Sequence, residues 1–126
     1  MPEITGLRHL GILVEDLARA KAFYESVLGL VPHPARPTLP YAGEWYELSD
    51  GRQLHLMCLP NPEAGLVRPE HGGRDRHAAF AVASLESLER ALESAGVSYT
   101  LSKSGRSALF CRDPDGNALE FVQTGV

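Results

Sequence analysis

The chain has 126 residues, of which 44% are apolar and 22% charged, and its net charge is −4. This composition is typical of one soluble globular domain and excludes a mainly disordered chain. No apolar run approaches the roughly 18 residues of a membrane span, and a mildly acidic chain without a basic stripe is a poor nucleic-acid binder. The first residues lack the pattern of a secretory signal, and Cys58 and Cys111 form no CxxC motif. We therefore expect a cytoplasmic protein with free thiols and with neither membrane nor nucleic-acid partners.

The first half of the chain predicts a strand, a helix and further strands. Apolar residues follow Asp16, a candidate N-cap, at helical spacing, and Gly29 suits the end of that helix. In chain order we predict a strand at 7–14, a helix from Asp16 to Leu28, a proline-rich loop or edge strand at 31–40, and strands at 45–48 and 52–59 joined by a Ser-Asp-Gly turn.

The second half predicts the same order of elements after a linker. Residues 60–76 are rich in Pro, Gly and charge, as expected of a linker. The predicted elements are a strand at 77–82, a helix that starts at the N-cap Ser84 and ends at Gly96, and strands at 99–103, 106–112 and 118–122, with an Asp-Pro-Asp-Gly turn at 113–116.

The two halves repeat one another. The apolar stripe at positions 17, 20, 24 and 27 recurs 68 residues later, as does His9 at His77, while His55 and Glu120 are 65 residues apart. Two unrelated units can share a helical stripe by chance, but here turns and polar strand residues match as well. We therefore predict an α+β fold of two duplicated modules, about 6–59 and 77–123, each a strand, a helix and three strands, within a single domain 1–126.

Four polar side chains lie inside apolar strands: His9, His55, His77 and Glu120. A single strand histidine is more often structural than ligating, but a buried polar group is costly unless it is paired or bound to metal. Equivalent positions of two repeats converge if a local two-fold axis relates the repeats. Three imidazoles and one carboxylate then predict a site for a divalent metal.

Strand alternation supports a cavity beside the histidines. His9 shares a face with Gly11, and His77 shares one with Ala79 and Ala81, whereas the opposite faces carry bulky residues. We expect the bulky faces to pack on the helices and the emptier faces to line a cavity. Arg106 and Arg112 flank the last hairpin, where either is a candidate for a substrate carboxylate or phosphate, although we expect both in solvent.

The segments GLRHLGILVEDLARAKAFYESVLGL, RHAAFAV and FCRDPDGNALEFV resemble the vicinal oxygen chelate superfamily of glyoxalases, bleomycin-resistance proteins and extradiol dioxygenases, over about residues 6–123. The resemblance implies two βαβββ modules that form a cup-shaped mixed sheet, with helices on the convex face and a divalent metal within. His9, His77 and Glu120 match the three usual ligands, and His55 matches the fourth position, where glyoxalase I usually has glutamate.

The resemblance further implies a metal-dependent, glyoxalase-like lyase or isomerase. Such an enzyme chelates vicinal oxygens of a small substrate and stabilises an enediolate-type anion, with Glu120, the only carboxylate of the set, as the base. The metal is expected to be Zn, Ni, Co, Mn or Fe, and the protein a homodimer. Whether one chain or two supply the ligands, and whether His55 is a ligand or only lines the cavity, stays open.

Three other functions remain alternatives. Two histidines and one carboxylate also suit a ring-cleaving extradiol-type dioxygenase on Fe(II), although His55 as a fourth ligand removes an open position. A fosfomycin-type thiol transferase has the same three ligands, but Gly11 stands where that family places threonine. The third alternative is a metal-free drug-binding protein of the bleomycin-resistance type. Such proteins generally lack the metal ligands, whereas this sequence has a ligand-type residue at all four positions.

Overall fold

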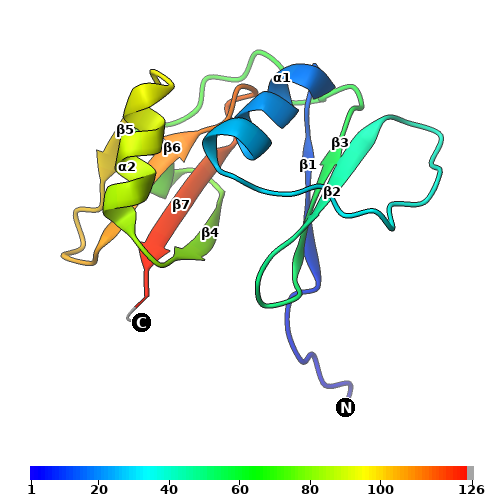
Figure 1. Cartoon of the computed structure of the whole chain (residues 1–126), viewed down its shortest axis with the longest axis horizontal. Helices are drawn as coiled ribbons and strands as arrows, with labels where there is room; N and C mark the ends of the chain where they lie inside the picture. Colours follow the sequence, from blue (N-terminus) through cyan, green and yellow to red (C-terminus); the bar gives the residue numbers. More distant parts are fainter. Residues whose placement is uncertain (125–126) are drawn as a thin grey trace. The chain divides into compact units, whose positions relative to one another are not determined.

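The computed structural model describes residues 1–124, which divide into two compact units, one of residues 1–61 and one that begins at Pro62. Each unit is an α+β module with one sheet and one main helix (Figure 1). The predicted α+β class is confirmed. No helix within these 124 residues is long and apolar enough to cross a membrane.

The first unit has a three-stranded mixed sheet in the order β1-β3-β2. Its strands are β1 (His9–Leu13), β2 (Gly43–Glu47) and β3 (Gln53–Met57). The central strand β3 runs parallel to β1 and antiparallel to β2. The β2–β3 hairpin turns at the predicted Ser-Asp-Gly, where Gly51 has φ +88°, a conformation that favours glycine.

The helix of the first unit begins as predicted and then widens. The Asp16 side chain caps α1 (Leu17–Lys21) by accepting from Arg19 N at 3.0 Å. The chain continues without a break as the π-helix η1 (Ala22–Val27), in which Leu28 N donates to Phe23 O five residues back. Consecutive Phe23 and Tyr24 are both buried there, whereas a regular helix would turn them further apart.

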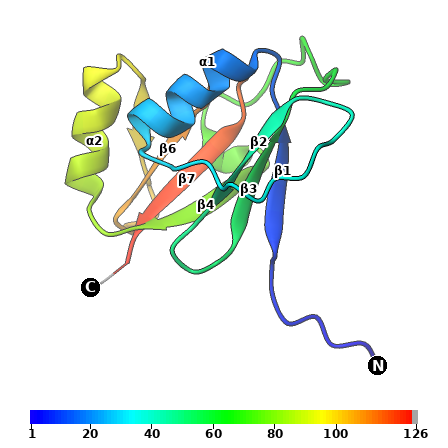
Figure 2. The same ribbon diagram turned by 45° about the vertical axis from the view of Figure 1, so that its right-hand side comes forward.

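For residues 31–40 of the first unit we predicted a loop or an edge strand, and the structure has the loop. We expected three strands after its helix, but the structure has two, and the proline-rich segment contributes only an isolated bridge between Pro32 and Tyr46. Proline has no N–H to donate, so a segment with four prolines cannot sustain a ladder. It forms instead the long loop that leads from η1 to β2 (Figure 2).

The second unit has a four-stranded sheet in the order β4-β7-β6-β5, with β4 parallel to β7 and the other pairs antiparallel. Its elements are β4 (His77–Val82), α2 (Leu85–Ser94), β5 (Tyr99–Leu101), β6 (Ala108–Arg112) and β7 (Ala118–Gln123). The predicted N-cap is confirmed, since the Ser84 side chain accepts from Ser87 N. All five predicted elements of this half are therefore present.

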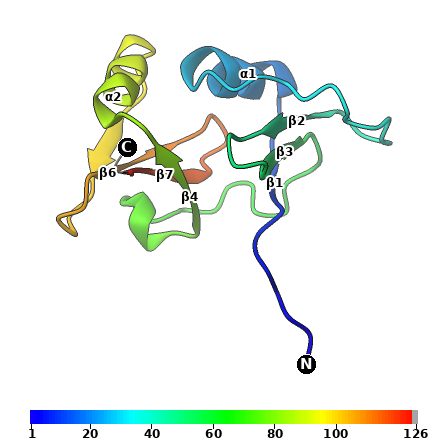
Figure 3. The same ribbon diagram turned by 60° about the horizontal axis from the view of Figure 1, so that its bottom comes forward.

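In both units the sheet has one face against its helix. Tyr46, Leu54 and Leu56 of the first sheet are at most 1% exposed, and the Tyr46 ring stacks on Tyr24 of η1. In the second unit, α2 covers one side of the sheet and the linker, with the short helix η2 (Gly72–Arg74), lies on the other (Figure 3). A Cβ added at Gly72 would lie 3.4 Å from the Cβ of Ala118 and 3.6 Å from that of Phe110, so η2 lies against this face of the sheet.

Candidate functional site

The four predicted ligands lie on the sheet faces turned away from the helices. Pairing of Gly11 with His55 places His9 and His55 on one face of the first sheet, since side chains two residues apart share a face. Pairing of Ala79 with Glu120 places His77 and Glu120 on one face of the second sheet. The structure thus places the four residues as two separate pairs, one in each unit.

In the second unit, His77 and Glu120 are in direct contact. His77 Nε2 lies 3.2 Å from Glu120 Oε1, and the Glu120 side chain is only 4% exposed. Two ligands that each lie about 2.0–2.2 Å from a zinc ion are themselves roughly 3 Å apart. The observed spacing therefore fits two neighbouring ligands of one ion.

The orientation of His77 is set by the backbone. Its Nδ1 lies 2.8 Å from the carbonyl oxygen of Asp75, and a carbonyl only accepts, so Nδ1 carries a proton. In the neutral imidazole Nε2 is then an acceptor, and it faces the carboxylate of Glu120, which is also an acceptor. Two acceptors at this distance need a positive charge between them, either a proton or a metal ion. A backbone carbonyl on the remote nitrogen is the arrangement found for metal-bound histidines.

The second oxygen of Glu120 has a cationic partner in the protein. Arg106 Nη2 donates to Glu120 Oε2 at 2.7 Å, although the Arg106 side chain is 57% exposed. The sequence predicts that the Arg106 side chain lies in solvent, and in the structure it does so only in part. Arg106 lies two residues before β6, and its guanidinium supplies a counter-charge to the buried carboxylate of Glu120.

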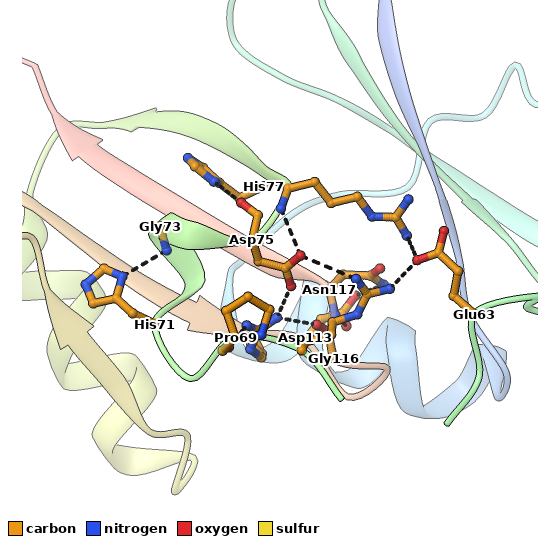
Figure 4. Close-up of polar contacts among 12 residues, drawn as sticks. Glu63, Pro69, His71, Gly73, Asp75, His77, Asp113, Gly116 and Asn117 are labelled. Atoms are coloured by element: carbon orange, nitrogen blue, oxygen red, sulfur yellow. Dashed lines mark hydrogen bonds and ion pairs between the residues drawn. The ribbon is translucent and has the colours of Figure 1, made fainter. Parts of the chain in front are cut away.

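Arg112 also differs from the expectation of a solvated side chain. It donates through Nη1 to Asp75 Oδ2 at 2.8 Å and to Gly116 O, and through Nη2 to Pro69 O, which ties the linker to the Asp-Pro-Asp-Gly turn (Figure 4). Asp75 also pairs with Arg68, and its pKa is lowered, chiefly by the hydrogen bond from Arg112. The charges of the linker thus fix the segment that immediately precedes His77.

In the first unit, three rings form a stack. The His55 ring lies between the rings of His9 and Trp45, at 4.1 Å from each, and is nearly parallel to both. Gln53 Oε1 lies 2.8 Å from His55 Nε2. The amide nitrogen of Gln53 donates to Glu47, so the amide oxygen faces His55 and accepts a hydrogen bond from its Nε2–H. His55 Nδ1 is then the nitrogen with a free lone pair, as a metal ligand requires.

Arg36 belongs to the same face and was not singled out from the sequence. An added Cβ at Gly43 would lie 3.0 Å from Arg36 Nη2, and Gly43 shares its sheet face with Trp45. The pKa of His55 is lowered, first by burial and then by the positive charges of His9 and Arg36. Only the loop conformation brings Arg36 here, and a loop has no periodicity from which to predict it.

No group of three or more His, Cys, Asp or Glu side chains gathers in metal-binding geometry within residues 1–124. Each unit offers two ligands of suitable chemistry, and two are too few for an ordinary site. The four-ligand site therefore stays a prediction.

Comparison with known proteins defines the family. A model of the Glyoxalase/Bleomycin resistance protein/Dioxygenase superfamily matches residues 6–121. The chain is 31% identical to "Glyoxylase I 4" of Arabidopsis thaliana, over 93% of this chain and 70% of that protein, and 32% identical to "Glutathione transferase FosA" of Serratia marcescens, over 93% and 79%. A solved structure, a putative glyoxalase family protein from Bacillus anthracis, has TM-score 0.78 at 21% identity and covers 98% of both chains.

The chain belongs to the Glyoxalase/Bleomycin resistance protein/Dioxygenase superfamily. The similarity predicted from the strand and turn segments is confirmed, and the relatives include enzymes that act on small molecules. The likeness to the Bacillus anthracis structure supports the fold.

Proposed function

We propose that the protein is a metal-dependent lyase or isomerase of the glyoxalase type, acting on a small substrate with vicinal oxygens. His9, His55, His77 and Glu120 would hold the divalent ion, which is Zn, Ni, Co, Mn or Fe. The observation that carries the proposal is the contact of 3.2 Å between His77 Nε2 and Glu120 Oε1, two acceptors on a sheet face away from the helix.

The donor set fits such an ion. Imidazole nitrogen and carboxylate oxygen are the ligands that borderline divalent metals accept. His77 is held in one tautomer by Asp75 O, and His55 by Gln53, so each has one nitrogen available. When bound, the ion supplies a Lewis acid that polarises a substrate carbonyl.

The remaining chemistry falls to the side chains of the protein. Glu120 is the carboxylate that would take the proton next to the carbonyl. Glu120 is buried, and Arg106 Nη2, which donates to its Oε2, holds the carboxylate in place while Oε1 faces His77. Arg106 is thus a positioning residue for the base.

The test measures proton abstraction directly. The full chain, stripped with chelator and reloaded with each of the five metals, is mixed with α-hydroxy carbonyl compounds and thiohemiacetals in D₂O, and exchange of the α-proton is followed by NMR. We expect exchange that requires both protein and metal. Glu120→Gln should abolish exchange while retaining part of the metal affinity, and full exchange in this variant would end the proposed role of Glu120.

A second candidate is metal-free binding of a small molecule. It is favoured by the Arg106–Glu120 pair, since the guanidinium already neutralises the buried carboxylate. Metal analysis separates the two functions. Absence of stoichiometric metal, with no rise in melting temperature upon addition of Ni²⁺, Zn²⁺, Mn²⁺ or Fe²⁺, supports binding alone, whereas a clear rise supports the enzyme.

We also propose that the protein acts in the cytoplasm, as expected from its sequence, and that it is a homodimer, as its resemblance to the superfamily implies. Sedimentation equilibrium of the purified full chain tests the dimer, and a monomer at micromolar concentration contradicts it.

A further inference from the structure

Arg36 differs from the other half-buried arginines of the described chain. Arg68 and Arg112, which are also half-buried, both pair with the carboxylate of Asp75. Arg36, by contrast, has no carboxylate within ion-pair distance among residues 1–124, and its single hydrogen bond runs from Nη2 to Tyr41 O at 2.8 Å. A half-buried cation without a counter-charge is costly, because burial removes part of its hydration.

The guanidinium of Arg36 also has unused donors. It carries five N–H groups, of which one donates to Tyr41 O. Its Nε is buried with no hydrogen-bond partner in the part of the chain that the structure describes. The Tyr41 ring, 5.8 Å from Cζ, and the backbone carbonyl hold the group in place. A fixed guanidinium with free donors is pre-organised to bind a planar or tetrahedral oxyanion.

The space for Arg36 is provided by a glycine. A Cβ added at Gly43 would lie 2.2 Å from Leu56 O and 3.0 Å from Arg36 Nη2, so no side chain fits there. Gly43 shares its sheet face with Trp45 and, across the pair, with His55. The guanidinium therefore lies over the end of the face that carries the His9–His55–Trp45 ring stack, and not over the face that packs on α1.

We propose that Arg36 binds an oxyanion group of the ligand, a carboxylate or a phosph(on)ate, and that the ring stack contacts the rest of that ligand. This inference rests on the proposed function, because the ligand would be the substrate of the proposed enzyme. It adds that this substrate is an anion. The binding of the anion itself requires no metal, since Arg36, Tyr41 and the stack all lie in the first unit.

The experiment uses the metal-free full chain and two probes, methylphosphonate and acetate, each titrated at constant ionic strength. The Arg36 Nε–H signal is followed by ¹⁵N–¹H NMR, and the fluorescence of Trp45, the single tryptophan, gives a second readout. We expect saturable changes in both readouts with millimolar affinity for at least one probe. A response to methylphosphonate alone, or to acetate alone, supports the proposal and identifies the anion.

Three variants make the result specific. Arg36→Met keeps an unbranched stem and removes the charge, and should weaken anion binding about tenfold or more, with Arg36→Lys between it and the wild type. Arg90→Met makes the same change on the exposed face of α2 and should bind as the wild type does. If neither probe shifts the Arg36 signal, or if Arg90→Met weakens binding as much as Arg36→Met, the proposal is overturned. Because no metal is present, the outcome is independent of the lyase assay.

Discussion

Burial decides how much an ion pair contributes to the free energy of unfolding. Two aspartate–arginine pairs of this protein, which differ in burial, allow this effect to be compared. Asp75 and Arg112 lie 2.8 Å apart with side chains 8% and 26% exposed. Asp50 and Arg52 lie 2.6 Å apart with side chains 51% and 52% exposed. We predict that Asp75→Ala lowers the free energy of unfolding by about 2–3 kcal/mol, the range for charged hydrogen bonds that leave a partly buried partner behind. Asp50→Ala, with both groups in water, should leave the stability unchanged within error.

The assay is urea denaturation followed by circular dichroism. For a small protein the loss at Asp75 corresponds to a midpoint shift of roughly 1–2 M. Arg112→Met alone and together with Asp75→Ala completes a double-mutant cycle, in which the coupling should be favourable and well above that of an exposed pair. Equal midpoints for Asp75→Ala and Asp50→Ala would refute the reasoning from burial.

Three further predictions concern packing and thiol chemistry. Leu92→Ala, at a side chain of α2 with 0% exposure, should cost about 2–5 kcal/mol in the same denaturation assay, and a cost below 1 kcal/mol would contradict its place in the core. Gly43→Ala should lower the melting temperature measured by calorimetry, because its Cβ would lie 2.2 Å from Leu56 O, and an unchanged melting temperature would argue against this close approach. Burial raises the pKa of the Cys111 thiol to about 12, so a disulfide reagent at pH 8 should modify Cys58 rapidly and Cys111 only on unfolding; rapid reaction of both would contradict this environment.

The elements with strong local signals could be predicted from the sequence. Strand β4 has the predicted bounds 77–82, and both helices begin at their predicted caps, because capping and alternation are local properties. The π-helix at 22–27 could not be predicted, since its apolar stripe also fits a regular helix. The strand that the prolines prevent between residues 31 and 40 shows that repetition of sequence does not ensure repetition of hydrogen bonds.

The candidate site also has features that could be predicted from the sequence and features that could not. The shared faces of His9 with His55 and of His77 with Glu120 follow from strand alternation and register, once duplication is recognised. The arginines near these residues could not be predicted in this way. Arg106 reaches Glu120 with a long side chain, and Arg36 comes from a loop. The direction of a long side chain and the conformation of a loop depend on the tertiary structure, which no periodicity in the sequence encodes.

The most direct test of the metal site is a calorimetric titration of the metal-free full chain with Ni²⁺, repeated on His9→Ala and His77→Ala. We predict one ion per chain for the wild type and a loss of affinity of about tenfold or more in each variant, because each removed imidazole is a proposed ligand of the ion. An affinity that is absent in the wild type, or unchanged when His9 is removed, would contradict the account.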